Sequence, residues 1–572
     1  MEQILDAIRK GEHKLADELL QHYIAGLSQY DDVTAILDAV IGSHYGDRMR
    51  VWEAIRKGLK YNYRNYELYV MLGEYYLQED PTRAYLCYEN ALFYCDAPDD
   101  RTVIDGLLSQ LQADHKGFAS KTAIVIQPGA SLEDMIRCVK SIRMTTSEST
   151  RKIVLVTDPG SKEKILKWSR GQDDVIVVDG KTGKEWSAED GGEQTDLDGM
   201  DIFFLSGDAL LTENALFWLR MGLYEKKENG VAGSVFNVRE NLQMADGVTG
   251  VQDLFTFGAQ INIPQRYPYE EKLFLSGAAL LVKRSVWERI GALDRSLGEY
   301  KYEDFGLRVL TAGYRNILCK NSFIIRSEES TILKKSMKYS QRVQDERGRL
   351  NKKWGFNTGY YLGARQDLPG LIIEPKEQPL NILEIGCGCG ALLGYIKGIY
   401  PNTKAYGVEL LPDVAEIAVH MGEVICGDIE KMEFPWKEGY FDYIIMGDVL
   451  EHLMNPEDVL KKLRRYLKTG GHIIVSMPNV KHYSVLLPLL RWDVFPYSDS
   501  GILDRTHVKM YTGTEIQKLI QNSGYRLESM GYCSYSIPSD QEEKMLDILA
   551  TFLEGPSKET FLAYQYIIKA VK

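Results

Sequence analysis

The stretch NILEIGCGCGALLGYI, residues 381–396, constrains the fold of this chain more than any other feature. A short apolar run leads into glycines spaced two apart, and a helix-periodic apolar run follows. Glycine adopts backbone conformations that other residues avoid, and it lets a ligand approach backbone amides without a Cβ in the way. The stretch therefore predicts a strand, a nucleotide-binding turn and a helix within an α/β domain.

Two nucleotide-binding families share such a turn. Gly386, Gly388 and Ala391 fit G-x-G-x-x-G/A, the dinucleotide fingerprint. Gly386, Gly388 and Gly390, with Glu384 before them, fit the E-x-G-x-G-x-G motif of class I methyltransferases that use S-adenosylmethionine. The turn alone does not distinguish a redox cofactor from a methyl donor.

The residues after the turn favour the methyl donor. Glu409 ends the next predicted strand, where an acidic residue holds ribose hydroxyls in both families. Asp428 in VICGDIEKMEFP ends the third predicted strand, and DVLEHL and DRTHVKMYT follow in order before a closing strand in FLAYQYIIKAV. This series resembles the S-adenosylmethionine-dependent O-methyltransferases over residues 356–572.

That resemblance implies a Rossmann-like class I fold with a seven-stranded sheet, and S-adenosylmethionine as cofactor. The cofactor-binding residues it implies are Glu384, Gly386, Gly388, Gly390, Glu409, Asp428, Ile429 and Asp448. We expect His452 and His507 to be catalytic, because histidine titrates near neutrality and a hydroxyl acceptor gains from a base. Alternatively, His452 fixes the helix or the methionine end of the cofactor, and His507 braces its loop through Asp504.

Residues 119–355 alternate apolar strand patterns with amphipathic helices, which predicts a largely parallel sheet. The strands are predicted in KTAIVIQ, RKIVLVTD, DVIVVDG and DIFFLSGDALL. SGAALLV, GALD and YEDFGLR then follow in order. The whole segment resembles the family 2 glycosyltransferases of GT-A fold.

The resemblance implies inverting transfer from a nucleotide-sugar donor with a divalent metal, Mn or Mg. It implies that the donor is bound by Pro128, Asp158, Asp208 and Gly277. Asp208 is the expected metal ligand, because Ser206-Gly207-Asp208 keeps only the second carboxylate of the family's D-x-D-like motif.

The general base is expected at Asp304, with Glu303 as its neighbour in the family's ED pair. Each acidic residue also has a structural alternative. Asp208 suits a helix cap, and Glu303 and Asp304 suit the first turn of a helix. The histidine that this family often places near the end of the domain is missing, and Arg326 stands in FIIRSEES instead.

Residues 1–118 are predicted to be all helical. YELYVMLGEYYLQEDPTRAYLCYENALFYCDAP resembles a tetratricopeptide repeat, and Gly58-Leu59 and Ala91-Leu92 stand 33 residues apart, close to that repeat's period. The small residues allow paired helices to approach. We expect a docking platform for an acceptor or a surface for homo-oligomers; a helical cap on the next domain is the alternative.

Composition excludes several classes of function. The net charge of −13 gives no general reason to bind nucleic acid or an anionic membrane. No apolar run reaches the ~18 residues of a spanning helix. The N-terminus is charged and amphipathic rather than a signal peptide, and the 8 cysteines form no zinc ligand set, so we expect reduced cysteines and a cytoplasmic protein.

Together these patterns predict a bifunctional enzyme of three domains, 1–118, 119–355 and 356–572. One activity transfers a sugar to a surface glycan or a protein. The other O-methylates a hydroxyl, which we interpret as a hydroxyl of the glycan. Two alternatives stay open. Either the middle domain binds sugar without catalysis beside an active methyltransferase, or the repeats make the chain an assembly scaffold.

Overall fold

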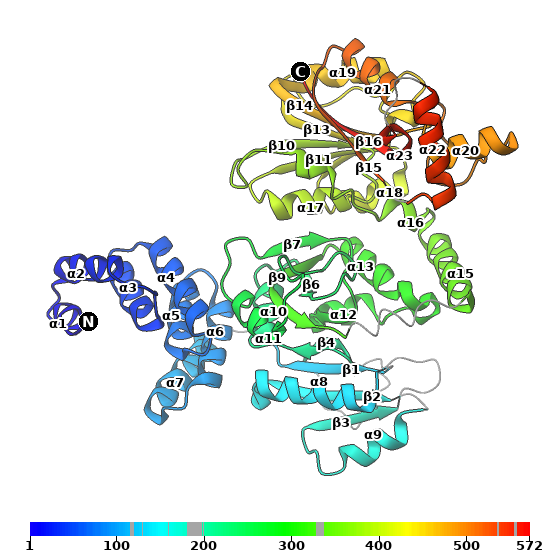
Figure 1. Cartoon of the computed structure of the whole chain (residues 1–572). Helices are drawn as coiled ribbons and strands as arrows, with labels where there is room; N and C mark the ends of the chain where they lie inside the picture. The colour runs from blue at the N-terminus through cyan, green and yellow to red at the C-terminus, as the bar shows by residue number, and fades with distance from the viewer. Residues whose placement is uncertain are drawn as a thin grey trace. The chain divides into compact units, whose positions relative to one another are not determined.

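The structure is a computed structural model of the whole chain (Figure 1). It describes all residues except 115–118, 129, 158–159, 180–196, 198, 328–336, 535–536 and 554–557. The chain divides into two compact units, Met1–Leu350 and Asn351–Lys572, which are described separately below.

The first unit begins with seven helices and no strand. Side chains cap four of them: Asp31, Asp47, Asn65 and Asp80 each accept a hydrogen bond from a backbone N–H in the first turn that follows. The helices are α1 (Glu2–Arg9), α2 (His13–Ala25), α3 (Asp32–His44), α4 (Arg48–Tyr61), α5 (Tyr66–Tyr76), α6 (Pro81–Tyr94) and α7 (Pro98–Asp114).

Small residues bring these helices close together, as the sequence predicts. A Cβ on Gly58 would lie 2.5 Å from the Cβ of Ala35, and one on Gly73 would lie 2.3 Å from the ring of Tyr88. Either distance is impossible for a real side chain, so α3 contacts α4 and α5 contacts α6 only because glycine stands at these two positions.

The helices share a core with the sheet region of the same unit. Phe217 and Trp218 of α10 (Ala215–Leu223) belong to the buried cluster that contains Leu68 and Tyr69 of α5. Arg220, also on α10 and 5% exposed, pairs with Glu89 of α6. The predicted boundary at 118/119 therefore separates two kinds of secondary structure that are joined by a buried contact.

The sheet of the first unit has the order β3-β2-β1-β4-β8-β6-β9-β5, and β7 pairs with β9. The strands β1, β2, β3 and β4 are parallel, as predicted. The rest of the sheet is mixed, because β8 runs antiparallel to β4 and β6, and β5 and β7 run antiparallel to β9. The strands are β1 (Thr122–Gln127), β2 (Arg151–Thr157), β3 (Val175–Asp179), β4 (Asp201–Ser206), β5 (Leu210–Leu211), β6 (Asn229–Phe236), β7 (Tyr269–Lys272), β8 (Ala279–Val282) and β9 (Arg315–Ile325).

Both faces of this sheet are covered. Ile124 and Ile126 of β1 enter one buried cluster, and Ala123 and Val125 enter another, as the alternation of side chains along a strand requires. The helices of this region, besides α10, are α8 (Leu132–Thr145), α9 (Lys162–Ser169), α11 (Leu254–Ile261), α12 (Arg284–Ile290) and α13 (Lys301–Thr311), with 3-10 turns η1 (Glu148–Thr150) and η3 (Arg295–Tyr300). Helix α15 (Met337–Trp354) reaches the boundary between the units.

The second unit contains the predicted seven-stranded sheet, in the order β12-β11-β10-β13-β14-β16-β15. Only β16 runs antiparallel to its neighbours. The strands are β10 (Asn381–Ile385), β11 (Lys404–Glu409), β12 (Glu423–Cys426), β13 (Phe441–Gly447), β14 (Leu467–Pro478), β15 (Arg526–Cys533) and β16 (Gln565–Val571). The strand in the opening stretch and the closing strand are both where the sequence predicts them.

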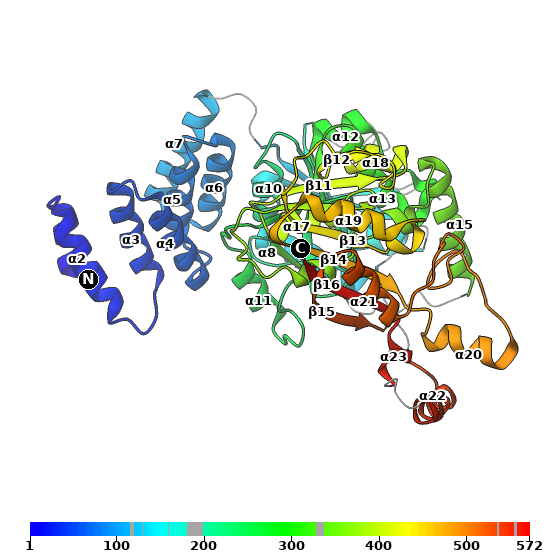
Figure 2. The ribbon, with the colours of Figure 1, turned by 90° about the horizontal axis from the view of Figure 1, so that it is seen from above.

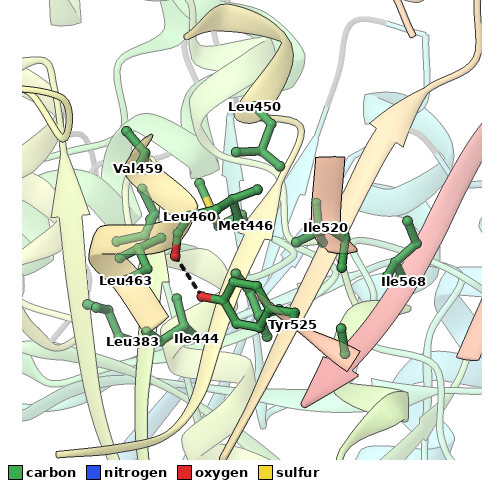
Figure 3. Close-up of a cluster of buried hydrophobic side chains, with 14 of the residues drawn as sticks. Leu383, Ile444, Met446, Leu450, Val459, Leu460, Leu463, Ile520, Tyr525 and Ile568 are labelled. Carbon is green, nitrogen blue, oxygen red and sulfur yellow. Dashed lines mark hydrogen bonds between the residues drawn. The ribbon is translucent and has the colours of Figure 1, made fainter. Parts of the chain in front are cut away.

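The main core of this unit lies between the sheet, α19 (Pro456–Tyr466) and α21 (Gly513–Asn522), and Figure 3 shows part of it. The hydroxyl of Tyr525 donates a hydrogen bond of 2.9 Å to the backbone oxygen of Leu460, so this buried hydroxyl is satisfied. The other helices are α16 (Thr358–Tyr361), α17 (Ala391–Ile399), α18 (Pro412–Ala418), α20 (Tyr483–Trp492), α22 (Asp540–Phe552) and α23 (Glu559–Leu562), with 3-10 turns η4 (Leu368–Leu371) and η5 (Leu450–His452).

Helices α20 and α22 lie side by side beyond one end of this sheet in both views (Figures 1 and 2). Tyr483 and Leu487 of α20 pack against Leu546 of α22 and Phe561 of α23. No helix among the described residues of either unit is long and apolar enough to cross a membrane.

Candidate functional site

The glycine turn, residues 386–390, joins β10 to α17 at the carboxyl end of the central strands. Gly386, Gly388 and Gly390 have φ values of +70°, +53° and +85°. These lie in the left-handed region that only glycine enters at little cost. The backbone N–H groups of Gly386 and Cys387 both donate to the oxygen of Val408 on β11, which fixes the turn against the neighbouring strand.

The turn also has no room for side chains. A Cβ on Gly388 would lie 2.9 Å from the backbone oxygen of Tyr361, and one on Gly390 would lie 2.7 Å from the Cβ of Met421. A Cβ on Gly386 would lie 2.7 Å from Val449. All three predicted glycines are therefore required both by φ and by the close packing of the turn against neighbouring residues.

Two carboxylates lie below the turn. Glu409, at the end of β11, accepts hydrogen bonds from the N–H of Gly388 at 2.9 Å and the N–H of Leu411 at 3.0 Å. Glu384, on β10, is 7% exposed, and its Oε2 has no hydrogen-bond partner among the described residues. Burial, and secondarily the charge of Glu409, raises the pKa of Glu384 to about 8, so this carboxyl carries its proton at neutral pH.

Asp428 and Ile429 follow β12. The carboxylate of Asp428 accepts from the N–H of Glu430 at 2.9 Å and pairs with Lys431, and these bonds lower its pKa. Ile429 is 7% exposed and belongs to the main core. The carboxylate thus stands at the rim of the site while the next side chain anchors the loop.

Asp448 stands at the end of β13 in a strained conformation. Its φ is +57°, which is uncommon for a residue other than glycine. Arg365 pairs with its Oδ2 at 2.5 Å, and Ser476 and Gln565 donate to its Oδ1 at 2.8 and 2.9 Å. The surrounding groups hold this carboxylate in place, and strain held in this way is typical of functional sites.

Glu451, His452 and His507 form what we call the Glu–His cluster, immediately beyond Asp448. One ligand atom from each lies within 4.8 Å of the others. Glu451 is fully buried, and neither of its carboxylate oxygens has a hydrogen-bond partner among the described residues. Burial, and then the charge of Asp448, raises its pKa well above the ordinary value, while burial lowers the pKa of His452.

The structure therefore brings the predicted cofactor and histidine residues to one edge of one sheet. The chain matches the family model described as a methyltransferase domain over residues 360–530. This part of the chain is a methyltransferase domain.

Several curated proteins resemble the chain in this methyltransferase domain, and each is named for a different acceptor. The malonyl-[acyl-carrier protein] O-methyltransferase of Halalkalibacterium halodurans is 33% identical over 111 residues, 18% of this chain and 41% of that protein. Ajmaline N-methyltransferase of Rauvolfia serpentina is 24% identical over 109 residues, which cover 18% of this chain and 37% of that protein. The tRNA U34 carboxymethyltransferase of Syntrophotalea carbinolica is 31% identical over 121 residues, which cover 20% of this chain and 37% of that protein. The chain spans less than half the length of these relatives.

Solved structures were also found. A SAM-dependent methyltransferase from Archaeoglobus fulgidus is 18% identical, with a TM-score of 0.25, and the match covers 43% of this chain and 100% of that one. Another, from Aquifex aeolicus, is 15% identical, with a TM-score of 0.24, covering 34% and 84%.

In the first unit, the carboxylate predicted to bind a metal is paired with an arginine. Arg326 Nε lies 3.2 Å from Asp208 Oδ2, and the hydroxyl of Ser206 donates to Asp208 Oδ1. Arg326 also pairs with Glu240 at 2.6 Å, and it is 8% exposed. The arginine that the sequence offers in place of the family's histidine thus contacts Asp208 directly.

The two candidate bases of this unit differ in exposure. Asp304 is fully buried and pairs with Arg308 one helical turn later, at 2.8 Å. Glu303 pairs with Arg347 at 2.6 Å, and burial raises its pKa. Asp304 was expected to be the better base; as the side chains stand, Glu303 is the more accessible carboxylate, with 16% of its side chain exposed.

The remaining predicted donor residues are placed only in part. Pro128 is half-buried directly after β1, and Gly277 precedes β8, with Tyr302 so close that a Cβ would lie 2.0 Å from its ring. Asp158 lies outside the described residues.

Three residues of the second unit's site were not predicted from the sequence. Tyr361 accepts a hydrogen bond from the N–H of Cys389 at its backbone oxygen, and Arg365 pairs with Asp448. Both stand in NTGYYLGAR, which has no periodicity that points to a site. Glu451 had a visible signal, because it lies inside DVLEHL directly beside His452.

Proposed function

We propose that the second unit transfers a methyl group from S-adenosylmethionine to a hydroxyl group of its acceptor. The observation that carries this proposal is the glycine turn, in which three left-handed glycines leave no room for a Cβ and Glu409 accepts a hydrogen bond from the N–H of Gly388. S-adenosylmethionine fits these residues, because a turn without side chains lets a nucleoside approach the backbone and a strand-end carboxylate accepts hydrogen bonds from ribose hydroxyls.

Different residues of the site would hold different parts of this cofactor. Glu409 would receive the ribose, Asp428 and Ile429 would flank the adenine, and Glu384 would brace the turn from below. Arg365 and Ser476 keep the Asp448 carboxylate at the strand end, where it would orient the methionine portion. When bound, S-adenosylmethionine supplies an electrophilic methyl group on a sulfonium, and positioning of the acceptor oxygen against it provides much of the rate.

The acceptor hydroxyl must lose its proton as the new bond forms. His452 and His507 lie at the edge of the site, with ring centroids 4.7 Å apart. The lowered pKa of His452 keeps its imidazole neutral at neutral pH, so its free nitrogen has a lone pair available. These rings can accept the proton from the acceptor hydroxyl directly. Alternatively, they can bind a positively charged group that lowers the pKa of that hydroxyl.

Methyl transfer is tested on the full chain with S-adenosylmethionine labelled in its methyl group. Candidate glycans and glycosylated proteins are incubated with the chain, and products are analysed by mass spectrometry. A gain of one labelled methyl group per acceptor, absent with Glu409→Gln, is the expected result. No label in any acceptor, together with no cofactor binding, would contradict the proposal.

For the first unit, we propose sugar transfer from a nucleotide-sugar donor with inversion. The parallel order β3-β2-β1-β4, the strand-end Asp208 and the Glu303-Asp304 pair on α13 support it. The helices α1 to α7 would present a glycan or protein acceptor or join copies of the chain, and a cytoplasmic location stays a prediction. The order of the two units suggests that the methyl group is placed on the transferred sugar.

A divalent cation does not fit Asp208 as its side chain stands. Both oxygens of this carboxylate are engaged, and one partner is the positive guanidinium of Arg326, which would repel a cation at the same oxygen. We therefore derive no step through a metal in this unit. Arg326 itself can carry the positive charge that a diphosphate leaving group needs.

A second candidate for this unit is sugar binding without catalysis. The observation in its favour is that Asp304, the expected base, is fully buried and paired with Arg308. Release of nucleoside diphosphate from nucleotide sugars separates the two candidates, when measured for the full chain and for Glu303→Gln and Asp208→Asn. Turnover that both substitutions abolish supports transfer, whereas donor binding without turnover supports the binding role.

A further inference from the structure

The Glu–His cluster joins two separate parts of the chain. Glu451 and His452 lie in η5, just after β13, and His507 lies in a loop more than fifty residues later. The backbone oxygen of Glu451 accepts hydrogen bonds from the N–H groups of Val508 and Lys509, at 3.0 and 3.2 Å. The loop is therefore fastened to the turn that carries the other two side chains.

The hydrogen bonds of His507 fix which of its nitrogens faces the cluster. Its Nδ1 lies 2.9 Å from the backbone oxygen of Ile502, and because a carbonyl only accepts, Nδ1 carries the hydrogen. In the neutral ring the lone pair is then on Nε2, which lies 4.0 Å from Glu451 Oε1. A histidine whose other ring nitrogen donates to a backbone carbonyl is the usual arrangement of a metal ligand.

His452 has the same arrangement. Its Nδ1 lies 3.3 Å from the backbone oxygen of Thr506 and 3.2 Å from the hydroxyl of the same residue. Nε2 is thus the nitrogen available to a further partner. Asp504 accepts from the hydroxyl and the N–H of Thr506, which holds this second contact in position.

Glu451 lacks what a buried carboxylate normally has. It is fully buried, and neither oxygen has a hydrogen-bond donor among the described residues. A buried carboxylate without a partner costs several kcal/mol unless a proton or a cation satisfies it. His507 turns the lone pair of its Nε2 toward Glu451, and Nε2 of His452 is likewise left for a further partner, so a shared positive ion would satisfy all three side chains.

We propose that Glu451, His452 and His507 bind a divalent first-row cation, and that this cation holds an acceptor with two neighbouring hydroxyl groups. Two imidazoles and one carboxylate suit Mn²⁺, Fe²⁺ or Zn²⁺ better than Mg²⁺. Ligand atoms about 2.1 Å from such an ion lie roughly 3.0–3.5 Å apart, so a small rotation of the half-buried His452 closes the set. Asp448 is not a ligand, because Arg365, Ser476 and Gln565 engage its oxygens.

This inference rests on the proposed methyl transfer and narrows its substrate class. Three protein ligands on a six-coordinate ion leave positions for two vicinal oxygens of the acceptor, as in a sugar ring. The ion lowers the pKa of the hydroxyl that it contacts, and the proton passes to solvent. The carbon–oxygen bond to the methyl group forms while the carbon–sulfur bond breaks, and the sulfur keeps the electron pair as a neutral thioether.

The experiment is a titration of metal-stripped full chain with MnCl₂, followed by electron paramagnetic resonance and by calorimetry. We expect one tight Mn²⁺ per chain. Glu451→Gln, which keeps the shape of the side chain, should weaken it at least about 30-fold, and His507→Gln at least about 10-fold. His472→Gln is the matched control, because His472 on β14 also faces a carboxylate, Glu528, at 3.0 Å, but outside the cluster.

The outcomes separate this inference from the proposed function. S-adenosylmethionine binding, measured by calorimetry on the same samples, reports folding and the cofactor site independently of the metal. Normal cofactor binding with no tight site for Mn²⁺, Fe²⁺ or Zn²⁺ would overturn the metal site alone. So would a Mn²⁺ site that survives Glu451→Gln but disappears with Asp208→Asn. Loss of cofactor binding in the wild-type chain would instead contradict the proposed function.

Discussion

The candidate acidic residues of the two units have different surroundings. In the first unit, Asp208, Glu303 and Asp304 each contact an arginine. In the second, Glu384 and Glu451 are buried with carboxylate oxygens that have no hydrogen-bond partner in the part of the chain that the structure describes. Arginines neutralise all three candidate acids of the first unit, whereas in the second unit Asp428 and Asp448 are paired with cations but Glu384 and Glu451, within the described residues, are not.

That difference indicates which unit is prepared for a ligand. A buried polar atom without a partner costs roughly 1–3 kcal/mol, so it persists where function requires it. In the second unit, three such oxygens belong to Glu384 and Glu451, which are residues of the candidate site that also contains the strained Asp448. In the first unit, a ligand must compete with Arg326 for Asp208, and the predictions below are designed to test this contrast.

The largest expected effect concerns the arginine of the first unit. Arg326→Met removes a buried partner from both Asp208 and Glu240, so the unfolding free energy of this unit should fall by roughly 3–5 kcal/mol. Differential scanning calorimetry measures the change. The double variant Asp208→Asn with Arg326→Met leaves one fewer unpaired charge and should recover part of the loss; equal stability of wild type and Arg326→Met would show that the carboxylates are not held by this arginine.

The next effect is a pH dependence in the second unit. The folded pKa of Glu384, about 8, lies above its unfolded value of about 4.3. Because the folded state favours the protonated form of Glu384, this carboxyl contributes its full stabilisation of the folded state below pH about 4.3. That contribution is lost progressively as the pH rises to about 8 and changes little above that. Between pH 5.5 and 8 the unfolding free energy should fall by about 3 kcal/mol.

Hydrogen exchange of the β10 and β11 amides at these two pH values measures that loss. Glu384→Gln should remove most of it, because the amide does not titrate. Glu416→Gln, at an exposed position of α18, is the matched control and should keep the wild-type pH dependence. An identical pH profile in Glu384→Gln would show that the buried carboxyl is not its source.

Substitution in the glycine turn should mainly affect cofactor affinity. Gly388→Ala adds a Cβ 2.9 Å from the oxygen of Tyr361 at a φ of +53°, so we expect S-adenosylmethionine to bind about 100-fold more weakly. Gly439→Ala is the control, with a φ of +67° and open space around its Cβ. It carries the same backbone strain but should leave the affinity within about 2-fold of wild type.

The smallest effect is expected on the surface. Arg64, in the loop between α4 and α5, pairs at 2.5 Å with Glu213, just before α10, but 58% of the Arg64 side chain is exposed. Arg64→Met should lower the unfolding free energy by less than about 1 kcal/mol, since solvent screens such pairs. A loss as large as that of Arg326→Met would mean that exposure does not decide how these pairs contribute.

Much of the fold could be predicted from the sequence because both sheets follow local patterns. The glycine turn, the strand containing Glu384 and the closing strand have apolar runs and turn residues that determine them without distant contacts. A seven-stranded sheet was expected from the resemblance. The packing of α10 against the helices was not, because Phe217 and Trp218 give no sign of which surface they bury against.

Site residues that act through their backbone conformation could be predicted from the sequence. Residues whose availability depends on an ion-pair partner could be predicted less well. Gly386, Gly388 and Gly390 stand as expected because their role depends on φ. Asp208 and Asp304 are acidic in the sequence, but Arg326 and Arg308 determine whether they are available. Sequence spacing does not reveal such pairings, since these residues meet only in the folded chain.

The most direct test of the central claim is calorimetry of the purified full chain with S-adenosylmethionine, with NAD⁺ titrated in parallel. The glycine turn fits both families by sequence, whereas Glu409, Asp428 and the seven-stranded order favour the methyl donor. We predict that one S-adenosylmethionine binds per chain with a micromolar Kd and that NAD⁺ does not bind. Binding of NAD⁺, with none of S-adenosylmethionine, would contradict the account.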